Sequence, residues 1–278
     1  MNNLIGILIH YRKNTDLIAE FNKAKALGLS SCHLCVWDPS VYTDDRAQEL
    51  ENAIHACAFP VTALWAGWSG PRESDLQFGP QTVGLVPAAY RAQRLNELLK
   101  ASDFAEKSGV SRIATHVGYL PEDPYHPDYL GTLPALRYLC RAMEEKGQTF
   151  LLETGQETPT TLLRTLNAID SDHIGVNFDT ANLMMYGKGN AVDALEQLAP
   201  FVREVHIKDG LYPTDGIRRG KEVPAGEGKA NLPAILRLLS QIGYTGTLTI
   251  EREITGEEQI RDIIATREKL LAWMSDLD

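Results

Sequence analysis

Short apolar runs alternate along the chain with longer segments in which apolar residues recur every three or four positions. The short runs are typical of buried parallel strands, and the longer segments have the spacing of amphipathic helices. The predicted strands are, in chain order, LIGILI, CHLCVW, VTALW, SRIATH, QTFLLE, HIGVNFD, FVREVHI and TGTLTIE. Helices are expected at about 15–27, 43–57, 87–107, 133–145, 159–168 and 191–198, from Pro233 onward, and at 257–274.

Strand and helix alternate eight times without a composition break or a linker. A closed parallel barrel fits this order better than an open doubly wound sheet, because an open sheet rarely runs to eight strict βα units. We therefore expect an α/β fold, a (β/α)8 TIM barrel, with residues 1–278 forming a single domain. Two connections, 66–86 and 208–231, are unusually long, and the first is interpreted as a lid or substrate loop.

Each predicted strand ends at a residue that can bind a metal or stack on a ligand. In chain order these residues are His10, Trp37, Trp65, His116, Glu153, Asp179, His206 and Glu251. The carboxyl ends of parallel barrel strands meet at one rim, and this rim carries the active site in TIM-barrel enzymes. The upper rim is therefore predicted to be the working face.

The last four strands end in a potential cage for a divalent cation, formed by Glu153, Asp179, His206 and Glu251. A lone acidic residue after a strand is more often a helix cap or a solvated loop residue, but four candidate ligands on consecutive strands change that balance. Three carboxylates and one imidazole suit Mn2+, Mg2+ or Co2+ better than a structural zinc, which usually takes thiolates and imidazoles. The sequence therefore predicts a metal site on this rim.

The segments WSGP, THVG, FLLETGQET, VNFDTANL, VHIKDG, VPAGEG and LTIERE follow one another along the chain. In these motifs the chain resembles the sugar phosphate isomerase/epimerase family of xylose-isomerase-like barrels, which is related to ketose 3-epimerases and inosose isomerases. The resemblance implies a divalent metal, Mn2+ first and Mg2+, Co2+ or Zn2+ as alternatives, held by Glu153, Asp179, His206 and Glu251. It also implies that Glu153 and Glu251 are catalytic and face opposite sides of one carbon. The chain departs from the ketose 3-epimerase branch at Asn182, where that branch carries a histidine.

The expected chemistry is proton transfer next to a carbonyl. A carboxylate beside the metal can remove the weakly acidic proton, while the metal stabilises the developing enediolate. Return of the proton gives epimerisation or aldose/ketose isomerisation, so we expect an isomerase or epimerase acting on a sugar, sugar phosphate or inosose. Loss of a substituent would instead make the protein a lyase acting on a keto-sugar derivative. A hydrolase of the apurinic-endonuclease kind and a metal-free sugar-binding protein are weaker alternatives.

Further rim residues are predicted to contact the substrate, and they are His116, Lys208, Trp37, Trp65 and Asn182. His116 is the main candidate for a hydrogen bond, although a rim histidine can also serve structure alone. Trp37, Trp65 and Trp68 could form an apolar wall against a sugar ring or simply pack together.

The loop after the seventh strand contains a second candidate binding element. Lys208 points to the same side as His206 and could hold a hydroxyl or phosphate oxygen, or it could pair with Asp209 or Glu227. The stretch AGEGKAN looks like a phosphate cradle, but the carboxylate of Glu227 opposes an anion there. The sequence therefore leaves open whether the substrate carries a phosphate.

Composition narrows the class of partner. A net charge of −10 and a pI near 5.2 argue against nucleic acid and anionic membranes and favour a small-molecule partner. The resemblance implies that this partner is a sugar, sugar phosphate or polyol ketone. The N-terminal segment has no cationic leader and no apolar run long enough for a membrane span, so a cytoplasmic location is expected. Four cysteines, Cys32, Cys35, Cys57 and Cys140, are expected to be reduced core thiols. A homo-oligomer is compatible with the sequence.

Overall fold

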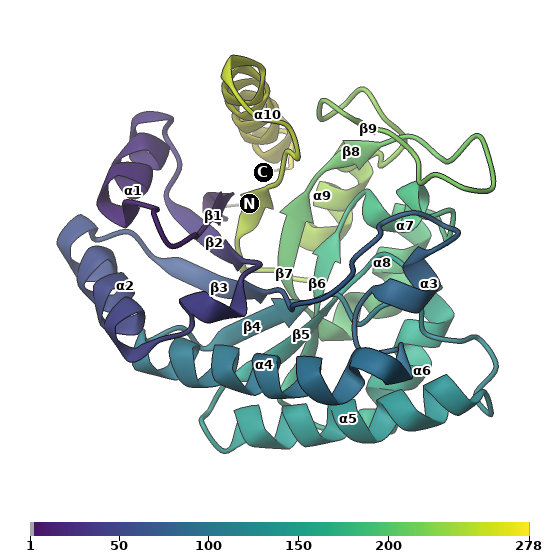
Figure 1. The fold of residues 1–278 in the computed structure, drawn as a ribbon. Coiled ribbons are helices and arrows are strands. Elements are labelled where there is room, and N and C mark those ends of the chain that lie inside the picture. The colour runs from purple at the N-terminus through teal and green to yellow at the C-terminus, as the bar shows by residue number, and fades with distance from the viewer. Residues whose placement is uncertain (1–2, 278) are drawn as a thin grey trace.

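The computed structural model describes residues 3–277 and shows eight parallel strands closed into a barrel (Figure 1). Each strand pairs with the next barrel strand along the chain, and the first pairs in parallel with the last. The barrel strands are β1 (Ile5–His10), β2 (Ser31–Val36), β3 (Val61–Ala66), β4 (Arg112–Thr115), β5 (Thr149–Glu153), β6 (Ile174–Asp179), β7 (Val202–Ile207) and β10 (Leu248–Ile250). The predicted (β/α)8 TIM barrel is confirmed, and every predicted strand overlaps an observed one.

The helices that connect these strands surround the barrel (Figure 1). They are α1 (Leu17–Ala26), α2 (Asp44–Cys57), α4 (Ala88–Lys107), α5 (Pro127–Glu144), α6 (Pro159–Ile169), α8 (Ala191–Leu198), α9 (Leu232–Gln241) and α10 (Glu257–Ser275). Several begin at a polar side chain that accepts a backbone N–H of the first turn, as Asp16 does from Ala19 at 3.0 Å. Their apolar faces pack onto the strands and form the main core.

Helix α5 begins at Pro127, well before the expected start near 133. Proline suits a first turn because its missing N–H would have no partner within the helix. His126 caps this end, since its Nδ1 accepts the backbone N–H of Asp128 at 3.1 Å. Pro134 lies inside the helix and removes one backbone hydrogen bond without ending it. The expected start was therefore wrong, because Pro127 and His126 set the first turn.

The long connection at 66–86 is held in place by a buried arginine. The guanidinium of Arg94, on α4, donates to the backbone carbonyls of Pro71 (2.7 Å), Thr82 (2.7 Å) and Gly84 (2.6 Å). Arg94 itself is fully buried. The loop contains one short helix, α3 (Gly79–Thr82).

The remaining loops contain short regular elements. These are the helical turn α7 (Asn182–Met185), the antiparallel pair β8 (Asp209–Gly210) and β9 (Glu222–Val223), and 3-10 turns at Pro39–Val41 and Ala199–Phe201. The β8–β9 pair and its tip project beyond the end of the barrel (Figure 1). The four cysteines are free and buried, as expected for core thiols. Within residues 3–277, no helix is long and apolar enough to cross a bilayer.

Candidate metal centre and cavity

The four residues predicted to form a metal cage come together at the carboxyl end of the barrel. Glu153 ends β5, Asp179 ends β6, His206 lies near the end of β7, and Glu251 follows β10. One ligand atom from each lies within 4.8 Å of the other three. Strand register explains part of this arrangement, because Asp179 pairs with His206 across β6 and β7.

His206 is the centre of this carboxylate cluster. Its Nδ1 lies 3.0 Å from Glu153 Oε1 and 3.1 Å from Glu251 Oε2. Burial alone would lower the imidazole pKa, but the two carboxylates outweigh it and raise the pKa of His206 to about 10. The ring nitrogen that faces the carboxylates therefore carries a proton at neutral pH, in the position where a cation would bind.

Asp179 has one satisfied and one unsatisfied oxygen. Its Oδ1 accepts the backbone N–H groups of Ala181 (2.8 Å) and Asn182 (2.7 Å), which fixes the carboxylate at the start of α7. Its Oδ2 is buried without a hydrogen-bond partner, and burial raises the pKa of Asp179 well above its ordinary value. A buried acceptor without a donor, close to two other carboxylates and an imidazole, is a site that a hard cation would satisfy. The donor set therefore fits a divalent ion.

Lys208 places a positive charge beside this cluster. Its Nζ lies 3.3 Å from Glu251 Oε2 and 3.8 Å from Asp179 Oδ2, and it also binds Glu253. Burial would lower the ammonium pKa, but Glu251 and Glu253 raise the pKa of Lys208 well above its ordinary value. The lysine is therefore a permanent cation at 2% exposure. The alternative pairing with Asp209 or Glu227 was wrong.

Glu253 links the cluster to the β8–β9 loop. One of its oxygens binds Lys208 and the other binds Arg219. Burial opposes ionisation, yet Lys208 and Arg219 together lower the pKa of Glu253 to about 2. Glu253 is consequently an anion that positions two cations, and no feature of the sequence analysis had assigned it to the site.

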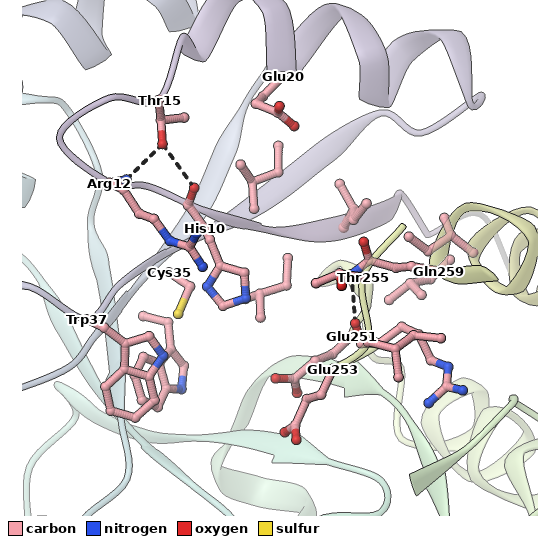
Figure 2. A pocket seen from close by; sticks show the side chains of 18 of the residues that line it. His10, Arg12, Thr15, Glu20, Cys35, Trp37, Glu251, Glu253, Thr255 and Gln259 are labelled. Carbon is pink, nitrogen blue, oxygen red and sulfur yellow. Dashed lines mark hydrogen bonds between the residues drawn. The ribbon is translucent and has the colours of Figure 1, made fainter. Parts of the chain in front are cut away.

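A cavity of about 970 Å³ opens above the cluster. Of the cluster residues, Glu153 and Glu251 line it, and so do the predicted substrate contacts His116, Trp37 and Trp65. Figure 2 shows His10 and Trp37 on one side of the cavity and Glu251 and Glu253 on the other. Lys208 and Asn182 are buried elsewhere, where Lys208 Nζ lies 3.4 Å from Asn182 Oδ1. Neither residue lines the cavity, and their contact with a substrate stays a prediction.

Three tryptophans form the apolar wall of the cavity. The ring centroids of Trp37 and Trp65 are 4.5 Å apart, and Trp68 lies 5.7 Å from Trp37. The indole N–H of Trp65 donates to Glu153 Oε2, and His116 Nε2 lies 3.7 Å from the same oxygen. The aromatic wall thus orients a cluster carboxylate as well as facing the cavity.

The glycine-rich stretch AGEGKAN is not free to bind a phosphate. The carboxylate of Asp209 accepts the backbone N–H groups of Gly226 (2.9 Å), Gly228 (2.9 Å) and Ala230 (3.0 Å). It also accepts the N–H of Gly210 at 2.9 Å. The resemblance to a phosphate cradle was therefore misleading, because a carboxylate of the same chain already fills the nest.

His33 and Glu204 are buried polar residues below the cluster that the sequence analysis did not single out. They lie in the middle of β2 and on β7, away from the strand ends from which the metal site was predicted. A signal was present, because Glu204 is two residues before His206 and so shares its inward face. The same alternation turns His33 and Cys35 to one side of β2.

Comparison with known proteins agrees with the observed fold. The sequence matches the family model described as xylose isomerase-like TIM barrel over residues 21–274. A xylose isomerase domain protein from Planctomyces limnophilus has a solved structure with 32% identity and a TM-score of 0.91, covering 99% of this chain and 98% of that one. A D-tagatose 3-epimerase-like protein is 19% identical with a TM-score of 0.76, covering 99% and 98%. The latter likeness concerns the fold alone.

Curated relatives match over shorter stretches. Inosose dehydratase from Klebsiella pneumoniae is 26% identical over 133 residues, which make up 41% of this chain and 44% of that protein. The chain spans about half the length of the curated relatives it matches. Their activities are accordingly properties of those proteins.

Proposed function

We propose that this chain, which belongs to the xylose isomerase-like TIM barrel family, is a divalent-metal-dependent isomerase or epimerase of a sugar or a related polyol ketone. One observation carries the proposal: Glu153 and Glu251 belong to the four-residue cluster and also line the cavity. Two carboxylates that converge on one point of a cavity can take a proton from one side of a substrate carbon and return one from the other.

The proposed metal ligands are Glu153, Asp179, His206 and Glu251. A divalent ion held there would supply positive charge that stabilises an oxyanion next to the reacting carbon. Asp179 is the most firmly fixed ligand, because two backbone N–H groups hold its other oxygen. The preference for oxygen donors favours Mn2+, with Mg2+, Co2+ or Zn2+ as alternatives.

The remaining residues orient the substrate and the bases. Trp65 and His116 both contact Glu153 Oε2, so they hold this carboxylate toward the cavity. Trp37, stacked on Trp65, offers a flat apolar surface of the kind that packs against a sugar ring and keeps water away. The substrate is a small molecule, since a cavity of about 970 Å³ has the size of a small-molecule site.

A dehydratase is a second candidate, and the match to inosose dehydratase favours it. In that reaction a carboxylate takes the proton beside the carbonyl, the neighbouring carbon–oxygen bond breaks, and an acid protonates the departing hydroxide to give water. His116 is placed to supply that proton, because its Nε2 lies 3.7 Å from Glu153 Oε2 at the cavity wall. Isomerase and dehydratase share the first step and differ in the second.

The test is a panel of ketoses, their phosphates and inososes, incubated in D2O with the Mn2+-loaded protein. We expect deuterium on the carbon next to the carbonyl, and either a new isomer or a product lighter by one water, as read by NMR and mass spectrometry. Glu153→Gln and Glu251→Gln should each lower exchange by about 10²–10⁴-fold, on the scale of general-base removal. Glu227→Gln, in an exposed loop, is the matched control.

Two results would decide against this chemistry. Product without deuterium uptake would indicate hydride transfer, and undiminished exchange in both glutamine variants would place the base elsewhere. Full activity after exhaustive treatment with EDTA would rule out the metal. Absence of turnover combined with sugar binding and no bound metal would support a sugar-binding protein instead.

A further inference from the structure

A line of buried polar side chains leads from the candidate metal centre through the interior of the barrel. His206 Nε2 lies 2.8 Å from His33 Nδ1, and His33 Nε2 lies 3.2 Å from Glu204 Oε2. Arg112 binds the other carboxylate oxygen, Glu204 Oε1. The side chains of His33, Glu204 and His206 have no solvent exposure.

The order of donors along this line follows from its two ends. Arg112 can only donate, so Glu204 is held as an ionised acceptor. The nitrogen of His33 that faces Glu204 must then carry a hydrogen. A neutral imidazole has one N–H, so Nδ1 of His33 is left as an acceptor for Nε2–H of His206.

This order of donors determines whether Nδ1 of His206, the nitrogen that faces the carboxylates, can bind a metal. With Nε2 of His206 held as a donor to His33, the proton that a cation can displace is the one on Nδ1, and its loss leaves a lone pair directed toward Glu153 and Glu251. A metal can bind only through such a lone pair. Asn177 Nδ2 lies 3.2 Å from His206 Nε2 while Asn177 Oδ1 has no partner, and this tautomer requires the amide to be turned so that Oδ1 faces the N–H.

We infer that His33 and Glu204 are positioning residues that fix the metal-binding tautomer of His206. The inference rests on the proposed metal site and extends it to residues that touch neither the cavity nor the candidate ligand atoms. If His33 and Glu204 only fill a polar gap inside the barrel, it does not matter which ring nitrogen of His206 carries the proton. The two readings differ in what an isosteric change at Glu204 does.

Glu204→Gln reverses the expected tautomers while keeping shape. Arg112 would retain the amide oxygen, so the NH2 group would face His33 Nε2 and make it an acceptor. His33 would then donate from Nδ1 to His206 Nε2, so the single proton left on His206 would be the one on Nδ1, where it blocks the metal. His33→Gln is the matched control, because its amide can accept from His206 and donate to Glu204.

The measurement is Mn2+ affinity by calorimetry, with imidazole 15N NMR of the Zn2+-loaded and metal-free proteins. We expect Glu204→Gln to weaken Mn2+ binding by about 10–100-fold, as loss of a supporting contact to a metal ligand typically does. In the metal-free protein it should change the His206 signals from those of a ring protonated on both nitrogens to those of the neutral Nδ1–H form. His33→Gln should bind Mn2+ within a few-fold of wild type and keep the proton on His206 Nε2. Circular dichroism and thermal melting show whether each variant is folded.

The outcomes separate this inference from the proposed function. Suppose that the wild-type protein binds Mn2+ and that Glu204→Gln has the same Mn2+ affinity and the same His206 signals. This result would overturn the positioning role and leave the metal site intact. Equal losses in Glu204→Gln and His33→Gln, without a change of tautomer, would also overturn it in favour of a structural role. Absence of divalent-ion binding by the wild-type protein would overturn the proposed function itself, and this inference with it. Should Glu204→Gln fail to fold, His33→Leu tests the same contact, with weaker Mn2+ binding expected and unchanged binding counting against it.

Discussion

Lys208 Nζ lies 3.3 Å from Glu251 Oε2, at the edge of the carboxylate cluster. Its positive charge offsets the repulsion between the buried carboxylates. Replacement by methionine keeps the length of the side chain and removes the cation. Breaking a buried ion pair typically costs about 3–5 kcal/mol, so the metal-free variant should melt well below the wild type. Added Mn2+ should recover part of the loss, because it supplies positive charge to the same carboxylates.

Thermal melting with and without Mn2+ measures this effect, and Lys229→Met, at an exposed position, is the control. A metal-free Lys208→Met protein as stable as the control would show that the lysine is not the counterion of the cluster.

Asp179→Asn tests the ligand set with little change of shape. The asparagine oxygen can still accept the N–H groups of Ala181 and Asn182, but an NH2 group replaces the oxygen that has no partner. We expect bound metal to fall far below one ion per chain, while the metal-free protein folds normally. Elemental analysis after dialysis against Mn2+ gives the answer, with Asp215→Asn in an exposed loop as control. Wild-type metal content in Asp179→Asn would mean that the cage is misassigned.

Glu157 gives the protein a pH-dependent stability. Burial raises the pKa of its carboxyl to about 8, against an ordinary value of 4.5. Between these values the unfolded chain loses the proton and the folded chain keeps it, so stability falls by about 1.4 kcal/mol for each pH unit. Glu157→Gln removes this penalty, which is absent below pH 4.5 and fully developed above pH 8.

Urea unfolding at pH 5 and pH 7.5 measures the difference. The Glu157→Gln variant should gain stability relative to the wild type as pH rises, and Glu227→Gln provides the exposed control. A gain that is equal at both pH values would show that the carboxyl is not protonated in the folded protein.

Asp209 is predicted to be the main anchor of the loop at 208–231. Asp209→Asn keeps one acceptor oxygen but turns an NH2 group toward the N–H groups of Gly226 and Gly228. Unsatisfied buried donors cost about 1–3 kcal/mol, so the melting temperature should fall and the loop should become open to trypsin. Asp172→Asn, at an exposed position outside this loop, is the control, and equal cleavage rates in the two variants would refute the anchoring role.

The sequence was sufficient for the barrel and for the four cluster residues. Glu153, Asp179 and Glu251 each close an apolar run, and parallel strands bring such ends to one rim whatever the loops do. His33 and Glu204 were missed because their partners lie on strands distant in sequence. The role of a buried polar residue in mid-strand cannot be inferred until its hydrogen-bond partner is known. Closure of the barrel supplies it, because β2 and β7 are not neighbours in the sheet and their inward side chains meet across the interior.

The misread phosphate cradle has a related cause. The N–H groups of a glycine-rich backbone can bind any anion, and the sequence does not show whether a ligand phosphate or a carboxylate of the same chain occupies them. Asp209 is near the stretch in space because β8 pairs with β9, a contact of two residues on each side that no hydrophobic pattern announces. The start of α5 was missed for a local reason, since two prolines, Pro127 and Pro134, compete for the same role.

Because Trp65 contacts Glu153, the intrinsic tryptophan fluorescence of the protein should report on the candidate metal centre. Three of the four tryptophans line the cavity, and the fourth, Trp273, lies on α10 outside it. Indole emission depends on neighbouring charge and on paramagnetic ions, so we expect Mn2+ or Co2+ at the proposed site to quench three emitters while Trp273 serves as an internal baseline. Ion and ligand occupancy can therefore be read from unlabelled protein in a fluorimeter, before any substrate is known.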